Sequence, residues 1–267
     1  MSRFENFFRL SVASLVRDRL LHLLFVLAVL SLFLIPAFSL FSMRQVQELA
    51  VTLSLSALSF LLLVLTVLTG ASSIWRDVER RYTFSVLGLP VSRADFVLGK
   101  FFAIALLLAV VAVVLAAGSF VAIKIAVSVY PADIPVNWLN FAVAVCFDYL
   151  KYVLLLSLAF VFSAVSTSFY LPFLGAIAIF MAGSASQEVY EFVTGSAGKD
   201  FAPLARSVVK LVYYVLPNFA AFDLKPQAIY ALPLVPGTLL LTLLYFVCYT
   251  GIMLSLAVWS FSRRELS

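Results

Sequence analysis

The sequence predicts an all-α integral membrane protein with six transmembrane helices, preceded by a helix in the membrane interface. Hydrophobic residues make up 64% of the 267 positions, whereas charged residues make up only 12%. A soluble domain has about 45–50% apolar and about 25% charged residues, and no soluble fold of this length buries such an excess. The apolar residues also gather into runs of roughly 20 residues, the length of a helix that crosses a bilayer.

Residues 1–19 are expected to form the interfacial amphipathic helix. Apolar residues recur there at helical spacing, at Phe4, Phe7, Phe8, Val12, Leu15 and Val16. This pattern is typical of a helix that lies along the bilayer surface, and the alternative is an N-terminal extension of the first span. The next apolar run begins after Arg19 and lasts about 23 residues, longer than the core of a signal peptide. We therefore expect it to remain as the first span.

Residues 20–267 are expected to form one six-span domain, with spans over 20–42, 51–75, 96–121, 147–166, 169–190 and 237–261. Pro36 should kink the first span without breaking it, since neighbouring helices satisfy the freed carbonyl. The fourth span is the shortest, because its uncharged part gives only about 22 Å of helix. Crossing the bilayer requires either the inclusion of Asp148 and Lys151 or local thinning of the bilayer, so we expect both charges near one interface.

The distribution of basic residues predicts that both termini are cytoplasmic. Segments 1–19, 76–100 and 262–267 carry eleven Lys and Arg residues. The opposite face carries six, four of them in one long loop, and long loops contribute less to orientation. The basic residues lie at the ends of apolar runs, without a stripe of interleaved aromatics, so we expect no nucleic acid as a partner.

Three outer connections are expected, over 43–50, 122–146 and 191–236. The last is long and contains an amphipathic stretch at 203–216, followed by four prolines. A loop of this length with partial helicity is usually functional or membrane-associated. We expect re-entrant or surface helices that lie on, or dip into, the outer leaflet.

The segment 76–95, between the second and third spans, is the most informative part of the chain. Charges alternate from Arg76 to Arg81, apolar residues follow, and Pro90 ends the stretch. Ser92 is suited to cap the next helix, with Asp95 completing a variant of the capping box. The pattern predicts a short helix that projects into the cytoplasm, and the alternative is a solvated loop.

This segment resembles the corresponding region of ABC-2-type transporter permeases, through Glu79, Thr83, Pro90, Ser92, Arg93, Leu98, Gly99 and Lys100. Residues 216–224 resemble the outer segment before the last span of that family, so the resemblance covers essentially the whole chain. One departure is Tyr82, where the family usually has glycine. The resemblance implies a cytoplasmic coupling helix that docks into an ATPase subunit. The residues expected to carry this coupling are Glu79, Arg80, Arg81, Thr83, Phe84, Pro90, Ser92 and Arg93.

The chain itself has no phosphate-binding loop. The pair Gly99-Lys100 would require glycine at position 94 and Ser or Thr at 101, which are Ala94 and Phe101. The pair at 198–199 fails for the same reason. The resemblance therefore implies that ATP and Mg are bound by a partner ATPase, present in two copies beside two permease copies that we expect to be identical. A further partner at the outer face is possible, and we expect no catalysis and no cofactor in this chain.

Four ionisable residues form a candidate outer gate: Asp148, Lys151, Glu188 and Glu191. Charges within spans are costly and are functional hypotheses by default. The alternative is that Lys151 snorkels and that the carboxylates mark the interface. No metal site is expected, because His22 is the only histidine.

The function that these observations favour is the transmembrane permease subunit of an ATP-driven exporter in the bacterial inner membrane. Two alternatives lack an ATPase partner. One is a secondary transporter, although no inverted repeat is visible. The other is an intramembrane maturation factor or enzyme, although the acid pairs lie at the ends of spans.

Overall fold

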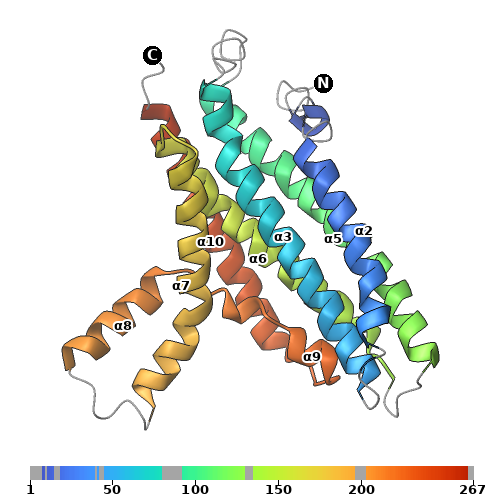
Figure 1. The fold of residues 1–267 in the computed structure, drawn as a ribbon. Helices are drawn as coiled ribbons and strands as arrows, with labels where there is room; N and C mark the ends of the chain where they lie inside the picture. The colour runs from blue at the N-terminus through green and yellow to red at the C-terminus, as the bar shows by residue number, and fades with distance from the viewer. Residues whose placement is uncertain are drawn as a thin grey trace.

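A computed structural model describes residues 8–9, 11–14, 19–39, 41, 45–79, 92–129, 135–195 and 203–263. Regular structure in these residues is helical, and six of the described helices are long and apolar enough to cross a membrane. They are α2 (Arg19–Ser39), α3 (Val46–Glu79), α5 (Arg93–Val129), α6 (Trp138–Val165), α7 (Tyr170–Thr194) and α10 (Pro236–Arg263). The predicted six-span helical fold is therefore confirmed (Figure 1).

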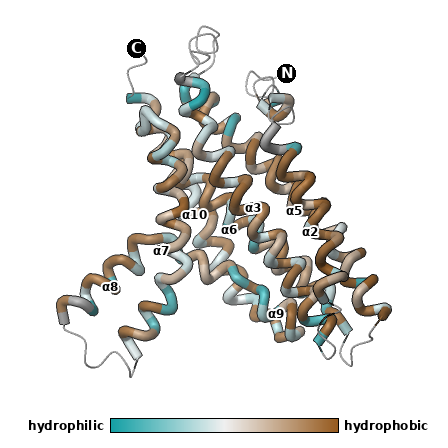
Figure 2. The backbone as a smooth tube through the Cα atoms, in the orientation of Figure 1, coloured by the Kyte–Doolittle hydropathy of each residue, from teal (hydrophilic) through white to brown (hydrophobic). Residues whose placement is uncertain are grey.

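The end of α3, the start of α5 and the end of α10 lie at the same end of the bundle as both chain termini (Figure 1). The shorter elements α8 (Pro203–Val215), η2 (Ala220–Phe222) and α9 (Lys225–Ile229) follow α7 toward the opposite end. Apolar residues dominate the middle of the long helices, and hydrophilic residues gather toward the ends (Figure 2). We call the end that holds both termini the terminal end and the other the α9 end.

Helix α6 forms the centre of the bundle. It packs against α3, α5, α7 and α10, and every residue from 151 to 160 is buried. In contrast, α2, α7 and α10 leave much of their apolar surface exposed, including Phe33, Leu174 and Leu241. Exposed apolar faces on a membrane helix are suited to lipid or to another membrane subunit.

The fourth span begins nine residues earlier than the sequence predicts, at Trp138 instead of position 147. The Asn137 side chain accepts hydrogen bonds from the backbone N–H groups of Leu139 (3.1 Å) and Asn140 (3.3 Å), which makes it the N-cap of α6. Buried Asn140 donates to the carbonyls of Gln227 and Leu232, both at 2.8 Å. Polar residues that resemble a loop in the sequence are thus the capped first turn of a longer helix.

The expected amphipathic stretch at 203–216 is helix α8, which extends sideways from the bundle and contacts α7 (Figure 1). The rings of Tyr190 in α7 and Tyr213 in α8 stack with centroids 4.3 Å apart. Helix α2 continues through Pro36 to Ser39. Of the expected interfacial helix, residues 8–9 and 11–14 are helical and Arg19 is the first residue of α2, whereas residues 1–7, 10 and 15–18 lie outside the described residues.

Candidate functional site

The expected coupling segment enters and leaves the bundle at the terminal end, through the last turn of α3 and the first turn of α5. Arg80, Arg81, Thr83, Phe84 and Pro90 lie outside the described residues. Glu79 is the last residue of α3, and its side chain also lies outside the described part. Ser92 and Arg93 are described. We call the last turn of α3 and the first turns of α5, which flank the segment in the structure, its two roots.

Ser92 caps helix α5, as the sequence predicts. Its hydroxyl oxygen accepts a hydrogen bond from the Asp95 N–H at 3.1 Å and donates to the Asp95 carboxylate at 2.7 Å. The Ser92 carbonyl accepts from the Phe96 N–H at 3.1 Å, the first helical bond. A capped first turn satisfies N–H groups that would otherwise lack partners. The cap therefore fixes where the coupling segment ends and α5 begins.

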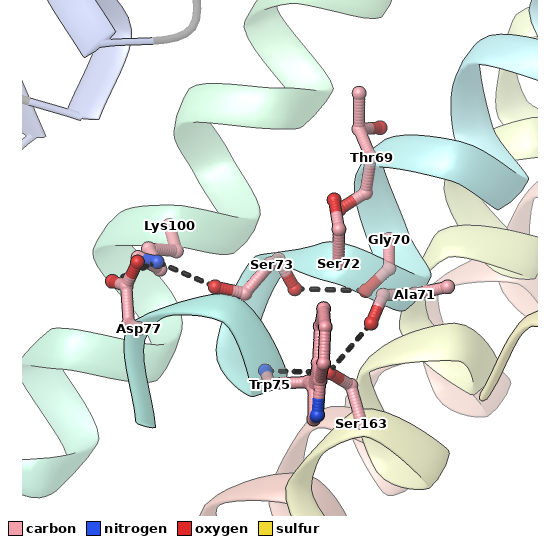
Figure 3. A network of polar contacts seen from close by, with 9 residues as sticks. All are labelled: Thr69, Gly70, Ala71, Ser72, Ser73, Trp75, Asp77, Lys100 and Ser163. Carbon is pink, nitrogen blue, oxygen red and sulfur yellow. Dashed lines mark hydrogen bonds and ion pairs between the residues drawn. The ribbon is translucent and has the colours of Figure 1, made fainter. Parts of the chain in front are cut away.

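Lys100 joins the two roots to each other (Figure 3). Its ammonium forms an ion pair with Asp77 of α3 and donates to the Ser73 carbonyl at 2.6 Å. The two side chains expose only 14% and 18% of their surface. The ammonium also lies 5.2 Å from the centroid of the Phe96 ring. Because a charge-assisted bond in a poorly solvated place is stronger than one in water, Lys100 ties α5 to the last turns of α3.

Ser163 of α6 joins the bundle centre to the same turn of α3 (Figure 3). Its hydroxyl accepts from the Trp75 N–H at 3.2 Å and donates to the Ala71 carbonyl at 3.1 Å. In a regular helix these two backbone groups bond directly to each other. A side chain from another helix thus inserts into the hydrogen-bond ladder of α3, which is a recognised cause of local bending.

Two further contacts strengthen this junction. The Trp75 indole N–H donates to the Thr167 carbonyl at 3.1 Å, in the connection between α6 and α7. At Gly70 the backbones of α3 and α6 approach so closely that an added Cβ would lie 2.8 Å from the Ala159 Cβ. Small residues permit such close approach between membrane helices. The terminal half of α3 is therefore held against α6 by packing and by hydrogen bonds.

Arg93, the first residue of α5, connects that helix to α10 through its side chain. Its Nη1 donates to the backbone carbonyls of Ser262 at 2.7 Å and Phe261 at 3.3 Å, in the last turn of α10. One turn further along α5, the Phe96 ring stacks on the Phe261 ring, with centroids 5.5 Å apart and an interplanar angle of 12°. The sequence indicates neither contact, because α10 is remote in the chain.

A cavity of about 560 Å³ opens beside these junctions. It lies between the end of α3 and the connection from α6 to α7, and its lining is Ser72, Trp75, Arg76, Thr167, Ser168, Phe169 and Tyr170. The lining combines a guanidinium group, hydroxyl groups and aromatic rings. The terminal end of the bundle therefore offers a recess as well as a projecting segment.

The four residues of the expected outer gate do not form one cluster. Asp148 and Lys151 form an ion pair, and the Ser59 hydroxyl of α3 donates to the Asp148 carboxylate at 2.7 Å. Both charged residues are buried near the middle of α6. Their expected position near an interface is wrong, because α6 begins at Trp138 and extends well beyond them.

Glu188 and Glu191 are exposed on α7, away from that pair. The Glu191 carboxylate accepts a hydrogen bond from the Gln187 side-chain NH2 group at 2.9 Å. The side-chain oxygen of Gln187 accepts a hydrogen bond from the Asn218 side-chain NH2 group at 3.1 Å. The Asn218 N–H donates to the Tyr245 hydroxyl oxygen at 3.0 Å. Sequence reasoning missed this polar chain, because its members come from three separate segments.

The described residues contain no group of three His, Cys, Asp or Glu side chains able to hold a metal ion. The same part of the chain holds two free cysteines, Cys146 and Cys248.

The sequence model of a family described as "ABC-2 family transporter protein" matches residues 7–266. No curated protein matches the chain.

Proposed function

The chain belongs to the ABC-2 transporter family, and from that premise we propose that this permease is the membrane half of an exporter driven by a separate ATPase subunit. The observation that carries the proposal is the Lys100 junction, which joins both roots of the 76–95 segment at one end of the bundle. A force applied to a segment whose roots are joined moves α3 and α5 together. If the two helix ends were not joined, the same force could move the loop without moving α3 and α5 together.

We propose that the partner ATPase docks on residues 76–95. Charged Glu79, Arg80 and Arg81 steer and pair with the ATPase, and Phe84 inserts into an apolar cleft of that subunit. Support comes from the ties that lead away from the roots, through Ser163 to α6 and through Arg93 to α10. Closure of the ATPases would tilt these helices between inward-facing and outward-facing states.

We propose a complex of two identical permeases and two ATPases, with ATP and Mg bound by the ATPases. The sequence lacks a phosphate-binding loop, so the nucleotide site belongs to another chain. The apolar faces that α2, α7 and α10 leave exposed provide surface for a second permease as well as for lipid. The exposed face of α8 offers a place for an additional partner at the outer side.

We propose that both termini are cytoplasmic, in a bacterial inner membrane. Arg76, Arg93, Lys100 and Arg263 all belong to helix turns at the terminal end. Basic residues flanking spans favour the cytoplasmic side. In this orientation the 76–95 segment faces the compartment that contains ATP.

At the outer side, we propose that Glu188 and Glu191 contribute to a polar exit for the substrate. Both are exposed, and they flank Tyr190, whose ring stacks on Tyr213 of α8. Asp148 and Lys151 have a different role, since they satisfy each other and bind α3 through Ser59. We assign this pair to the stability of the bundle centre.

Affinity purification of the tagged chain from its native membrane in mild detergent tests the proposal, with mass spectrometry and an ATPase assay as readouts. We expect a stoichiometric protein with Walker motifs, and ATPase activity that responds to changes at residues 79–81. A chain that purifies alone, without ATPase activity, would contradict the proposal. Transport assays in inside-out vesicles then test direction, because an exporter loads such vesicles when ATP is added outside.

A further inference from the structure

We propose that Arg93 is a positioning residue that transmits displacement of the 76–95 segment to the last span, α10, and does not contact the ATPase. The inference rests on the proposed function and changes the role that the sequence suggested for this residue. Its basis is the contact between the first turn of α5 and the last turn of α10.

The acceptor groups explain why an arginine is suited to this position. The final carbonyls of an α-helix have no N–H partner within the helix, and they form the negative end of its dipole. Arg93 donates from Nη1 to two of these carbonyls, those of Phe261 and Ser262. A guanidinium is planar, always charged and rich in donors, so it caps the end of α10 while its own backbone belongs to α5.

An apolar contact accompanies the cap. Phe96 and Phe261 are both fully buried and stack nearly parallel. An aromatic pair with this centroid distance contributes stability beyond the apolar area that it buries. The cap and the stack together hold the end of α10 against the first two turns of α5.

The same face of α5 is also bound to α3, because Lys100 lies one helical turn after Phe96. Lys100 lies against the Phe96 ring, pairs with Asp77 and donates to the Ser73 carbonyl. A continuous series of contacts thus runs from α3 through Lys100 and Phe96 to Phe261, with Arg93 beside it. The start of α5 is the point where the root of the 76–95 segment meets the last span.

The position of α10 determines where a displacement passed through the Arg93 contact would lead. Among the described elements, α10 packs on α6 and on α5, and the contact with α5 at the terminal end is the one adjacent to the 76–95 segment. At its other end α10 begins at Pro236, directly after the segment that carries α9. A displacement passed through Arg93 would therefore reach the α9 end of the molecule along one helix.

The test uses the full permease–ATPase complex in lipid nanodiscs, with native Cys146 and Cys248 replaced by serine. Spin labels are placed at Thr167→Cys, in the connection between α6 and α7, and at Ser255→Cys on α10. Both sites are exposed. The distance between the labels is measured by pulsed electron paramagnetic resonance without nucleotide and after trapping with ATP and vanadate.

We expect trapping to shift the distance in the unsubstituted complex. Arg93→Gln should abolish the shift while the ATPase still co-purifies at the same ratio, and Arg93→Lys should retain part of the shift. Lys124→Gln is the matched control, since Lys124 is a cation on the same helix, exposed at its other end. This variant should preserve the full shift.

Three results would overturn the inference, and each would exclude a different part of the account. An unchanged shift in Arg93→Gln would show that α10 follows the segment without this contact. Loss of the ATPase from the Arg93→Gln and Arg93→Lys complexes would make Arg93 a docking residue, as the sequence suggested. A chain that binds no ATPase in any variant would refute the proposed function as well.

Discussion

Lys100 of α5 forms an ion pair with Asp77 of α3, and these two residues stand on either side of the 80–91 segment. The pair closes the base of that segment, and the Ser73 carbonyl provides the third member of the junction. Because both side chains are largely removed from solvent, the junction acts as a fixed connection between two spans.

Replacing Lys100 with methionine should destabilise the protein more than removing both charges. Lys100→Met leaves the Asp77 carboxylate without its counter-ion, and breaking a buried pair costs about 3 kcal/mol or more. Adding Asp77→Asn removes the uncompensated charge, so the double variant should recover most of that loss. Thermal unfolding in detergent measures the stability of the single and the double variant. Lys124→Met is the control, because Lys124 is an exposed lysine on the same helix.

If the double variant proved as unstable as Lys100→Met, the charge of Asp77 would not be the source of the loss. The bond from Lys100 to the Ser73 carbonyl would then dominate the junction.

Gly70→Ala should force α3 and α6 apart. The new methyl group would lie 2.8 Å from the Ala159 Cβ and 3.1 Å from Leu156 Cδ1. The leucine tip can rotate away, but the alanine Cβ is fixed to its backbone, and overpacking costs about 1–3 kcal/mol. Adding Ala159→Gly should restore stability by returning the lost space. Gly251→Ala on α10 is the control, because, apart from its chain neighbours and the adjacent helix backbone, no heavy atom lies within 4 Å of its added Cβ.

Equal stability of Gly70→Ala and Gly251→Ala would contradict the close packing of α3 on α6. If Ala159→Gly failed to restore the stability of Gly70→Ala, the new methyl group would clash with a residue other than Ala159.

Ser163→Ala should cost more stability than Ser157→Ala, although both serines are buried in α6. The Ser163 hydroxyl bridges Trp75 and Ala71 of α3, whereas the Ser157 hydroxyl donates to Leu154 within its own helix. Loss of an interhelical hydrogen bond in a membrane protein costs about 0.6 kcal/mol on average and up to about 1.7. Chemical denaturation of the two variants in matched detergent gives the difference, and a larger loss for Ser157→Ala would refute the bridging role.

Lys151→Met should destabilise the bundle centre by about 3–5 kcal/mol, because it leaves the buried Asp148 carboxylate without its counter-ion. Ser59→Ala should cost less, since it removes one hydrogen bond to that carboxylate. Glu188→Gln, on an exposed position of α7, should change stability by less than about 0.5 kcal/mol.

Transport separates the two roles proposed for these residues. Substitution of Glu188 should alter transport without loss of folded protein. The opposite result would contradict these roles. If Lys151→Met impaired transport at normal stability while Glu188→Gln did not, Asp148 and Lys151 would be gate residues.

The arrangement of spans follows from the sequence because hydropathy and length determine which helices cross a bilayer. The capping of α5 by Ser92 also follows, since a capping box is a local pattern. The start of α6 does not, because Asn140, Asp148 and Lys151 look like interface residues until their partners on α3 and near α9 are known.

The contacts of Arg93 and Ser163 were equally out of reach of sequence reasoning. Each joins segments far apart in the chain, through backbone carbonyls that carry no residue-specific signal. The sequence identified Arg93 through a motif and assigned it to ATPase coupling, whereas its observed partners include the carbonyls of Phe261 and Ser262 at the end of α10.

Site-specific photo-crosslinking tests the central claim most directly, that an ATPase drives this permease through the 76–95 segment. A benzophenone amino acid is placed at Phe84, within the segment, and at Tyr230, exposed at the α9 end. In native membranes we predict a crosslink from position 84 to a subunit with Walker motifs, strengthened by ATP trapping, and none from position 230. A crosslink to that subunit from position 230, or its absence from position 84, would contradict the account.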